Sequence, residues 1–377
     1  MNDCLELKIT NAMHRIEDLY FKTGGKCYLS FSGGKDSTVI LALIKMCEDI
    51  LTIPKNGIPA VFCNTGLELQ SNVNFVYFIK QNYYQNIVII RPEKSFDWII
   101  KNKGKPIKSK IKSQFLSRYQ KGNTSKNTIL NLLGKNGKVI KAKIANKDLH
   151  MIHPNFDIKV SDSCCLILKK KPFEKYNKEN DIKGYIIGER IAEGGVRELS
   201  ASKRINEGGS ICTKTKGDYI VKLPIIDWND EDINNFINKY DVLLSKAYTE
   251  QGYERTGCFL CPFSLKLADN LEKLYKYEPN RYKAAMKWMK DVYIAQNVIL
   301  KFDKEYENER KQKWFKDYDH MRYEMLKKYR PEVCEKFNNK QMNFSIIYRR
   351  NEHEQISRSV RVFYKINKSC SIKICKR

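Results

Sequence analysis

The first ninety residues alternate between two hydrophobic patterns. Residues 4–21 carry apolar side chains at helical spacing, and a Gly-Gly pair ends that pattern. Three short apolar runs then predict buried strands at residues 27–31, 58–63 and 87–90. The longer apolar segments between these runs predict helices at residues 38–49 and 71–84. Strands that alternate with helices are typical of a parallel sheet with crossover helices, so we expect an α/β, doubly wound fold.

The same alternation returns after a long interruption. Residues 184–188 and 221–226 predict two more buried strands, and a helix is expected to begin near Asn229, with three acidic residues in its first turn. Between the two halves, residues 101–150 are rich in lysine and only weakly periodic. We expect an insertion or mobile loop over the ligand edge of the sheet, or else an ordinary solvated loop.

The last part of the chain is helical in pattern and strongly charged. Aromatic residues are interleaved with the charges from about residue 268, and the tail after about residue 340 is basic. These aromatic residues either pack helices together or stack on the bases of a nucleic acid. We therefore expect a nucleotide-binding domain in residues 1–265 and a charged helical C-terminal region with a basic tail in residues 266–377.

The formal net charge of +26 favours polyanionic partners, either nucleic acid or phosphorylated small molecules. Biased codon usage, which the abundance of Lys, Asn, Ile and Tyr suggests, explains the same charge without a partner. No apolar stretch approaches the ~20 residues that span a bilayer. Acidic residues interrupt the N-terminal pattern where a signal peptide is apolar. We therefore expect a cytoplasmic protein that does not enter a membrane.

Twelve cysteines without an export signal argue against a disulfide framework. Two close pairs stand out, Cys164 with Cys165 and Cys258 with Cys261, and four thiols in this arrangement predict a metal or cluster site. Four thiolates suit either tetrahedral zinc or an iron–sulfur cluster, and four free thiols are the alternative. Adjacent cysteines favour the cluster, because neighbouring side chains diverge and a cubane has separated iron corners.

A candidate phosphate-binding loop follows the first predicted strand and opens the next helix. Its residues are Ser32, Gly33, Gly34, Lys35, Asp36 and Ser37. Glycines let backbone N–H groups approach an anion, the helix N-terminus adds aligned donors, and the lysine adds a full charge. The two serines offer hydroxyl donors, while the aspartate either orients a bound Mg²⁺ or caps the helix. A glycine turn with a helix cap is the plainer alternative, but it leaves the lysine unexplained.

This loop resembles the PP-loop of the ATP pyrophosphatases, and three further segments resemble the phosphoadenosine phosphosulfate (PAPS) reductase family within that group. The resemblance implies an adenosine nucleotide, ATP or adenylyl sulfate, at the carboxyl edge of the sheet. Thr65, Gly66 and Glu68 match a family segment near the adenosine, although Asn64 replaces the usual acid.

A second segment begins at Gly188 and contains Arg190 and Arg197, which by resemblance clamp sulfate or phosphate. Ordinary salt bridges are the alternative for these two arginines. The third segment is the pair Cys164 and Cys165 with a lysine run after it, which is similar to the assimilatory adenylyl-sulfate reductases. In that group the adjacent pair and a distant Cys-x-x-Cys hold a four-iron, four-sulfur (4Fe-4S) cluster.

The resemblance ends at the C-terminal segment whose cysteine attacks sulfur in the reductases. Cys334, Cys370 and Cys375 are the late cysteines of this chain, and the last two lie among lysines. We expect an enzyme that uses ATP and Mg²⁺ for adenylyl or sulfur transfer with the cluster, on nucleic acid or with a sulfur-donor protein. A true reductase that releases sulfite, and a non-catalytic regulatory protein bound to nucleic acid, are the alternatives.

Overall fold

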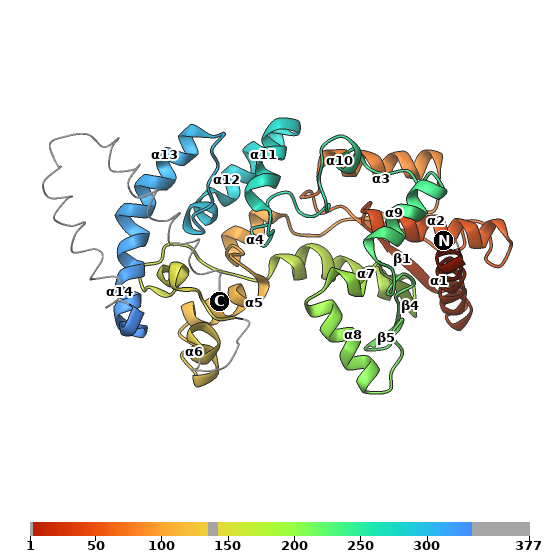
Figure 1. Ribbon diagram of the computed structural model, residues 1–377, viewed down its shortest axis with the longest axis horizontal. Coiled ribbons are helices and arrows are strands. Elements are labelled where there is room, and N and C mark those ends of the chain that lie inside the picture. Colours follow the sequence, from red (N-terminus) through yellow and green to blue (C-terminus); the bar gives the residue numbers. More distant parts are fainter. Residues whose placement is uncertain (1–2, 135–141, 334–377) are drawn as a thin grey trace, which may run out of the picture. The chain divides into compact units, whose positions relative to one another are not determined.

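A six-stranded sheet with the order β3-β2-β1-β4-β6-β5 organises the first part of the chain (Figure 1). The computed structural model describes residues 3–134 and 142–333. All neighbouring strands are parallel except β5 and β6, which form an antiparallel pair. The strands are β1 (Cys27–Phe31), β2 (Ala60–Cys63), β3 (Ile87–Ile90), β4 (Gly184–Ile186), β5 (Thr213–Lys216) and β6 (Tyr219–Lys222). The predicted α/β fold with a doubly wound, mostly parallel sheet is confirmed.

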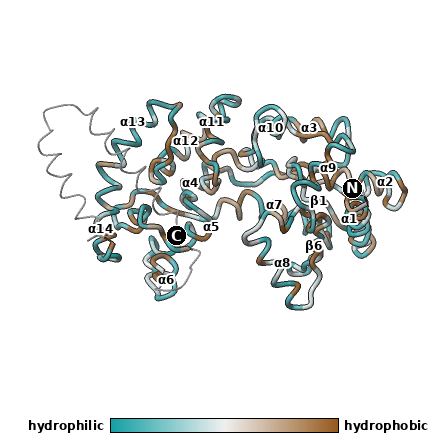
Figure 2. Tube along the Cα trace, in the orientation of Figure 1, coloured by the Kyte–Doolittle hydropathy of each residue, from teal (hydrophilic) through white to brown (hydrophobic). Residues whose placement is uncertain are grey.

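Side chains of β1 alternate between two hydrophobic layers, as the two-residue repeat of a strand requires. Leu29 belongs to the larger layer, and Tyr28 belongs to the layer on the other face. The larger layer is covered by α1 (Asp3–Lys22), α2 (Lys35–Asp49), α3 (Gln70–Asn82) and α9 (Asp230–Lys239). The other layer packs against α7 (Lys171–Glu179). Hydrophobic colour in Figure 2 accordingly gathers around the strands near β1 and β6.

Two helix starts on the larger layer differ in a way that matters for binding. At α9 the side chain of Asn229 accepts a hydrogen bond from Asp232 N, and the side chain of Asp232 accepts one from Asn229 N. The two residues form a capping box, so both N–H groups have an acceptor. At α2 the N-cap residue is Gly34, which has no side chain to accept the first N–H groups. The donors at the start of α2 are therefore left for another acceptor.

The lysine-rich residues 101–150, which we expect to be an insertion or mobile loop, contain α5 (Lys110–Gln120) and α6 (Lys126–Leu133) in their described part. Ser109 and Ser125 cap these helices by accepting an N–H from the first turn of each. Short helices with few apolar positions give little periodicity, which explains why the sequence did not predict these two helices.

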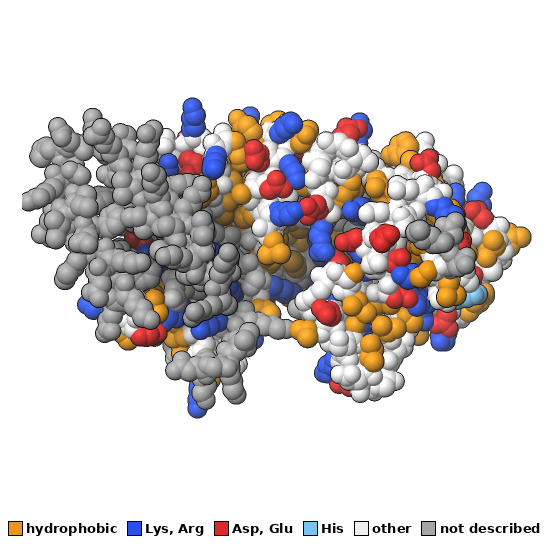
Figure 3. Space-filling model, viewed as in Figure 1, with side chains coloured by type: hydrophobic (Ala, Val, Ile, Leu, Met, Phe, Trp, Pro, Cys, Tyr) orange, Lys and Arg blue, Asp and Glu red, His pale blue; other side chains and the backbone are white. Residues whose placement is uncertain are grey.

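Other elements that the sequence analysis did not predict include an edge hairpin and a helix. The hairpin of β5 and β6 turns at Gly217, which has a φ of 59°, a backbone region that favours glycine. The helix α8 (Val196–Asn206) leaves Leu199 and Ile205 58% and 52% exposed, and Figure 3 shows hydrophobic side chains gathered over it. β6 ends earlier than predicted, at Lys222, shortly before Pro224, which lacks an N–H for the ladder.

Backbone contacts divide the described residues into two compact units. The first holds the sheet together with α11 (Leu267–Tyr277), α12 (Pro279–Ala295) and α13 (Lys304–Lys313), so the units do not divide where the sequence pattern changes near residue 266. In the described part of the second unit, η1 (Asn146–Ile152) packs against α14 (Asp319–Tyr329). No helix among residues 3–134 and 142–333 is long and apolar enough to cross a bilayer.

Candidate functional site

The predicted phosphate loop lies between β1 and α2, and it needs both of its glycines. Gly33 has a φ of 69°, and a Cβ on it would lie 3.0 Å from side-chain atoms of Asn72 and of Val76. A Cβ on Gly34 would lie 3.1 Å from Ser32 Oγ and 3.2 Å from Thr256 Oγ1. Any larger residue at these two positions therefore displaces the walls of the loop.

The serine hydroxyls of the loop bind the loop itself. Ser37 Oγ donates to Gly34 O at 2.9 Å and lies 3.0 Å from Ser32 Oγ, which in turn accepts from Gly34 N at 3.2 Å. Asn72 Nδ2, from α3, donates to Ser32 O at 2.8 Å. These bonds fix the turn, so the loop is shaped by its own side chains and by one amide from the neighbouring helix.

Lys35 starts α2 and contacts a residue distant in sequence. Its backbone N–H donates to the hydroxyl of Tyr248 at 3.3 Å, and its ammonium lies 5.4 Å from the centre of the same ring. Tyr248 belongs to α10 (Lys246–Thr249), and burial raises the pKa of its hydroxyl. Lys35 and Tyr248 also line a cavity of about 490 Å³ beside α9.

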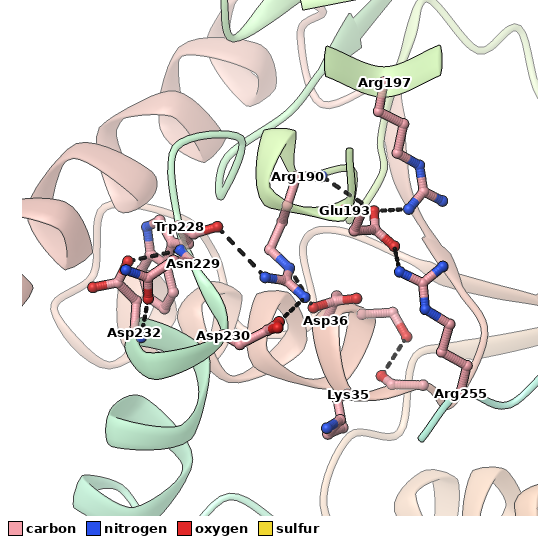
Figure 4. A network of polar contacts seen from close by, with 12 residues as sticks. Lys35, Asp36, Arg190, Glu193, Arg197, Trp228, Asn229, Asp230, Asp232 and Arg255 are labelled. Atoms are coloured by element: carbon pink, nitrogen blue, oxygen red, sulfur yellow. Dashed lines mark hydrogen bonds and ion pairs between the residues drawn. The ribbon is translucent and has the colours of Figure 1, made fainter. Parts of the chain in front are cut away.

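Arg190 links the first turns of two helices. Its Nε donates to Asp36 Oδ1 at 2.8 Å, and its Nη2 donates to Asp230 Oδ1 at 2.8 Å, while only 6% of the residue is exposed (Figure 4). Asp36 is therefore a partner of Arg190 and not the cap of α2. Gly188 makes the approach possible, because a Cβ there would lie 3.0 Å from Asp36 Cβ. The structure therefore brings Arg190 and Asp36 together.

Arg197 belongs to a second ion-pair group, joined through one carboxylate. Glu193 binds Arg197 and also lies 2.9 Å from Arg255 Nη2, and its own side chain is only 7% exposed (Figure 4). Burial, and then the charge of Arg255, lower the pKa of Arg197. Glu193 also lies within reach of the Arg190 backbone, since Arg190 N donates to Glu193 Oε2 at 3.4 Å. A continuous series of contacts thus connects the guanidinium groups of Arg190, Arg197 and Arg255 to the phosphate loop.

The predicted adenosine segment follows β2, and its residues form hydrogen bonds with one another. Glu68 accepts from Thr65 N at 2.9 Å and from Thr65 Oγ1 at 2.8 Å, and both residues are buried. Gly66 N donates to Asn64 Oδ1, and Gly66 O accepts from Arg281 Nη1 at 3.3 Å. The residues that match the family segment therefore build one tight turn at the carboxyl end of β2.

The four cysteines of the two predicted pairs influence one another's pKa, so they occupy one neighbourhood. The hydrogen bond that Cys165 accepts from Cys164 Sγ, at 4.0 Å, lowers the pKa of Cys165 to about 6 and raises that of Cys164. Burial raises the pKa of Cys258, and raises that of Cys261 to about 12. Among the described residues, however, no group of three or more His, Cys, Asp or Glu is placed to hold a metal ion.

Lys169 lies between the cysteine neighbourhood and the turn at β2. Negative charge on Cys258, followed by that of Glu68, raises the pKa of Lys169, and its ammonium lies 4.0 Å from Glu68 Oε1. The ammonium is one of three lysine charges that favour the Cys165 thiolate, together with Lys110 and Lys170. The lysine run that follows Cys165 is thus near the thiols.

A protein-family model described as the phosphoadenosine phosphosulfate reductase domain matches residues 26–132 and 123–264, which is more than half of the chain. The chain belongs to the PAPS reductase family. The match covers the phosphate loop, the arginine groups and the four cysteines.

Two proteins of Methanocaldococcus jannaschii are similar to this family member. Uncharacterized protein MJ0973 is 25% identical over 236 residues, which cover 63% of this chain and 41% of that protein. Uncharacterized protein MJ0066 is 25% identical over 254 residues, which cover 67% and 39%. The chain thus matches about two fifths of the length of these relatives. A crystal structure of PAPS reductase from Candida auris, a phosphate complex, is similar with a TM-score of 0.36 and 14% identity over 62% of this chain and 81% of that one.

Several residues of the site were missed in the sequence. Tyr248, Thr256, Arg255 and Asn72 belong to no motif, and only the position of Arg255 three residues before Cys258 offered a signal. Conversely, the predicted late nucleophiles Cys334, Cys370 and Cys375 lie outside the described residues. The roles expected for Arg190 and Arg197 as anion clamps stay predictions.

Proposed function

We propose that this PAPS reductase family member binds an adenosine nucleotide, ATP or adenylyl sulfate, at residues 32–37 and uses it for adenylyl or sulfur transfer. The observation that carries the proposal is the start of α2. There an uncapped helix N-terminus, the charge of Lys35 and a buried arginine meet at the carboxyl end of a central parallel strand. In open α/β sheets this edge is where ligands bind, and helix N-termini favour phosphate.

Each group near the loop has a task in this proposal. The N–H groups that start α2 bind phosphate oxygens, and Lys35 neutralises charge that develops on them. Asp36 is the protein carboxylate that would hold the Mg²⁺ that accompanies ATP, and the ion would offset negative charge on the phosphates. Arg190 holds Asp36 in place, while Arg197 and Arg255 supply guanidinium forks for the distal oxyanion.

The four cysteines are proposed to hold a 4Fe-4S cluster, with zinc as the alternative. Four sulfur donors in one neighbourhood, with lysine charges around them, support this assignment. Such a cluster supplies electrons or relays sulfur when it is bound. Lys169 and Lys170 stabilise the thiolate form that a metal requires.

Metal content tests the cysteine site directly. After anaerobic purification we expect iron and acid-labile sulfide with visible absorption, or else stoichiometric zinc. Cys258→Ser should lose most of the metal, because one of four ligands is removed. Cys212→Ser is the matched control, since Cys212 bonds Ser210 and Thr213 instead and should keep full occupancy. Protein that contains neither metal, or equal loss in both variants, would contradict the site.

Nucleic acid is the acceptor that the surface charge supports. Fourteen lysines and arginines and no acidic residue lie between Asp97 and Asp148. In the described part of this stretch, Lys110 is exposed at the start of α5, and its charge also acts on Cys165. A basic surface that begins beside the thiols suits a phosphate backbone whose reacting group must reach them.

Pyrophosphate release tests the reaction and the acceptor together. We expect the purified protein to release pyrophosphate from ATP with Mg²⁺, and a single-stranded oligonucleotide to stimulate release several-fold at low salt but not at high salt. The double change Lys121→Gln with Lys126→Gln, at two exposed lysines of this stretch, should abolish this stimulation and leave the basal rate. Turnover only with adenylyl sulfate and a thiol would favour a true reductase, and oligonucleotide binding without any turnover would favour a regulatory protein.

A further inference from the structure

One short stretch of chain, residues 248–261, contacts every part of the proposed site. It contributes Tyr248 to the phosphate loop, Arg255 to the Glu193 carboxylate, and Cys258 and Cys261 to the cysteine neighbourhood. Its Phe259 N also donates to Leu67 O at 2.8 Å, within the turn that follows β2. Groups that are separate in the sequence motifs are therefore joined by a single covalent segment.

The hydroxyl of Tyr248 is the point where this stretch meets the phosphate loop. It accepts two backbone N–H groups, from Lys35 and from Thr256, each at 3.3 Å, and it lies 2.9 Å from Thr256 Oγ1. Both N–H bonds are at the long end of the range for good hydrogen bonds. One side chain thus holds the first N–H of α2 and an N–H that lies two residues before Cys258.

A phosphate oxygen is a stronger acceptor for the Lys35 N–H than a tyrosine hydroxyl, because hydrogen bonds to ionised groups are shorter and stronger. A nucleotide that takes this N–H leaves the hydroxyl with its partners in Thr256. Burial raises the pKa of Tyr248, so the hydroxyl keeps its proton and can donate it to Thr256 Oγ1 or to the phosphate. The bonds of residues 254–258 therefore depend on what the phosphate loop holds.

We propose that Tyr248 is a positioning residue that couples occupation of the phosphate loop to the placement of Arg255 and Cys258. The inference rests on the proposed nucleotide site and adds a mechanical link from that site to the cysteines. The link runs from Lys35 N through the Tyr248 hydroxyl to Thr256, and from there along two peptide units to Cys258. It makes the placement of the Cys258 thiol responsive to the nucleotide.

Hydrogen–deuterium exchange of the peptide that covers residues 249–261 tests the coupling, with and without α,β-methylene-ATP and Mg²⁺. In the natural protein we expect the nucleotide to slow exchange of this peptide about fivefold, the effect of roughly one hydrogen bond. Tyr248→Phe keeps the ring beside Lys35 but removes the hydroxyl, so the nucleotide should no longer slow exchange there. Calorimetry on the same samples measures nucleotide affinity separately.

Tyr253→Phe is the matched control, because Tyr253 lies in the same stretch and its hydroxyl donates to Asn270 O at 3.4 Å and not to the phosphate loop or Thr256. This variant should keep the full nucleotide effect. A merely structural role for Tyr248 would raise exchange equally with and without nucleotide and would preserve the difference between the two, which would overturn the coupling. Binding of the nucleotide with no change of exchange in the natural protein would also overturn it. If no nucleotide binds, the proposed function falls, and the coupling falls with it.

Discussion

Replacing Lys35 by alanine is expected to weaken binding of ATP with Mg²⁺ by about 100-fold, or about 2.7 kcal/mol. The change removes the one full positive charge within residues 32–37 and leaves the backbone N–H groups of α2 in place. The glycine turn is held by serine and asparagine bonds that the substitution does not touch. The fold should therefore survive, and isothermal titration calorimetry measures the loss.

Lys45→Ala provides the comparison for this effect. Lys45 lies on the same helix, and its ammonium is 4.5 Å from the centre of the Tyr83 ring, not beside the phosphate loop. Its removal should leave the affinity within about twofold of the natural protein, because a half-buried charge that does not contact the phosphate loop acts only weakly on the ligand through the screening salt. Equal affinity of both variants for ATP would show that the nucleotide is bound elsewhere.

Arg190→Met is expected to lower the free energy of unfolding by about 2 kcal/mol and to weaken ATP binding by about tenfold. The Asp36 bond dominates the loss of stability, because the Asp230 side chain is 85% exposed and such pairs contribute little. The weaker binding follows because the Asp36 carboxylate then loses the partner that holds it in place. Urea denaturation and calorimetry measure the two effects.

Arg310→Met is the control that distinguishes a general loss of stability from a local loss of ATP binding. Arg310 is buried and pairs with Glu307 through its Nε at 3.0 Å and its Nη2 at 2.7 Å, within α13. Its loss should reduce stability by a similar amount and leave ATP affinity unchanged. If Arg310→Met weakens ATP binding as much as Arg190→Met does, the effect of Arg190 is general loss of stability and not a local one at Asp36.

Much of the sheet could be predicted because buried parallel strands are short runs of apolar residues. Residues 27–31 and 87–90 are strands with the predicted bounds, and the N-cap at Asn229 carries the expected acidic first turn. The strand β5 could not be found, because Thr213–Lys216 is entirely polar and pairs only at the edge. Its pairing depends on β6 and the glycine turn, not on its own hydrophobicity.

Part of the candidate site could be recognised in the sequence for a similar reason. Glycines, a lysine and paired cysteines stand out by residue type and spacing, so the candidate phosphate loop and the two cysteine pairs could be singled out. Tyr248 and Asn72 are ordinary residues in helices, and only the fold brings them to the loop. Whether an arginine binds a ligand or a neighbouring carboxylate is likewise decided by which acids the fold places beside it, as with Glu193.

The polar edge of the sheet limits how this chain can associate with others. β5 offers the open side of an antiparallel pair, and Lys216 on it is exposed. A strand from another molecule that docked there would have to strip water from an ammonium group before it gained any backbone bonds. The desolvation of Lys216 therefore opposes growth of the sheet from chain to chain at β5.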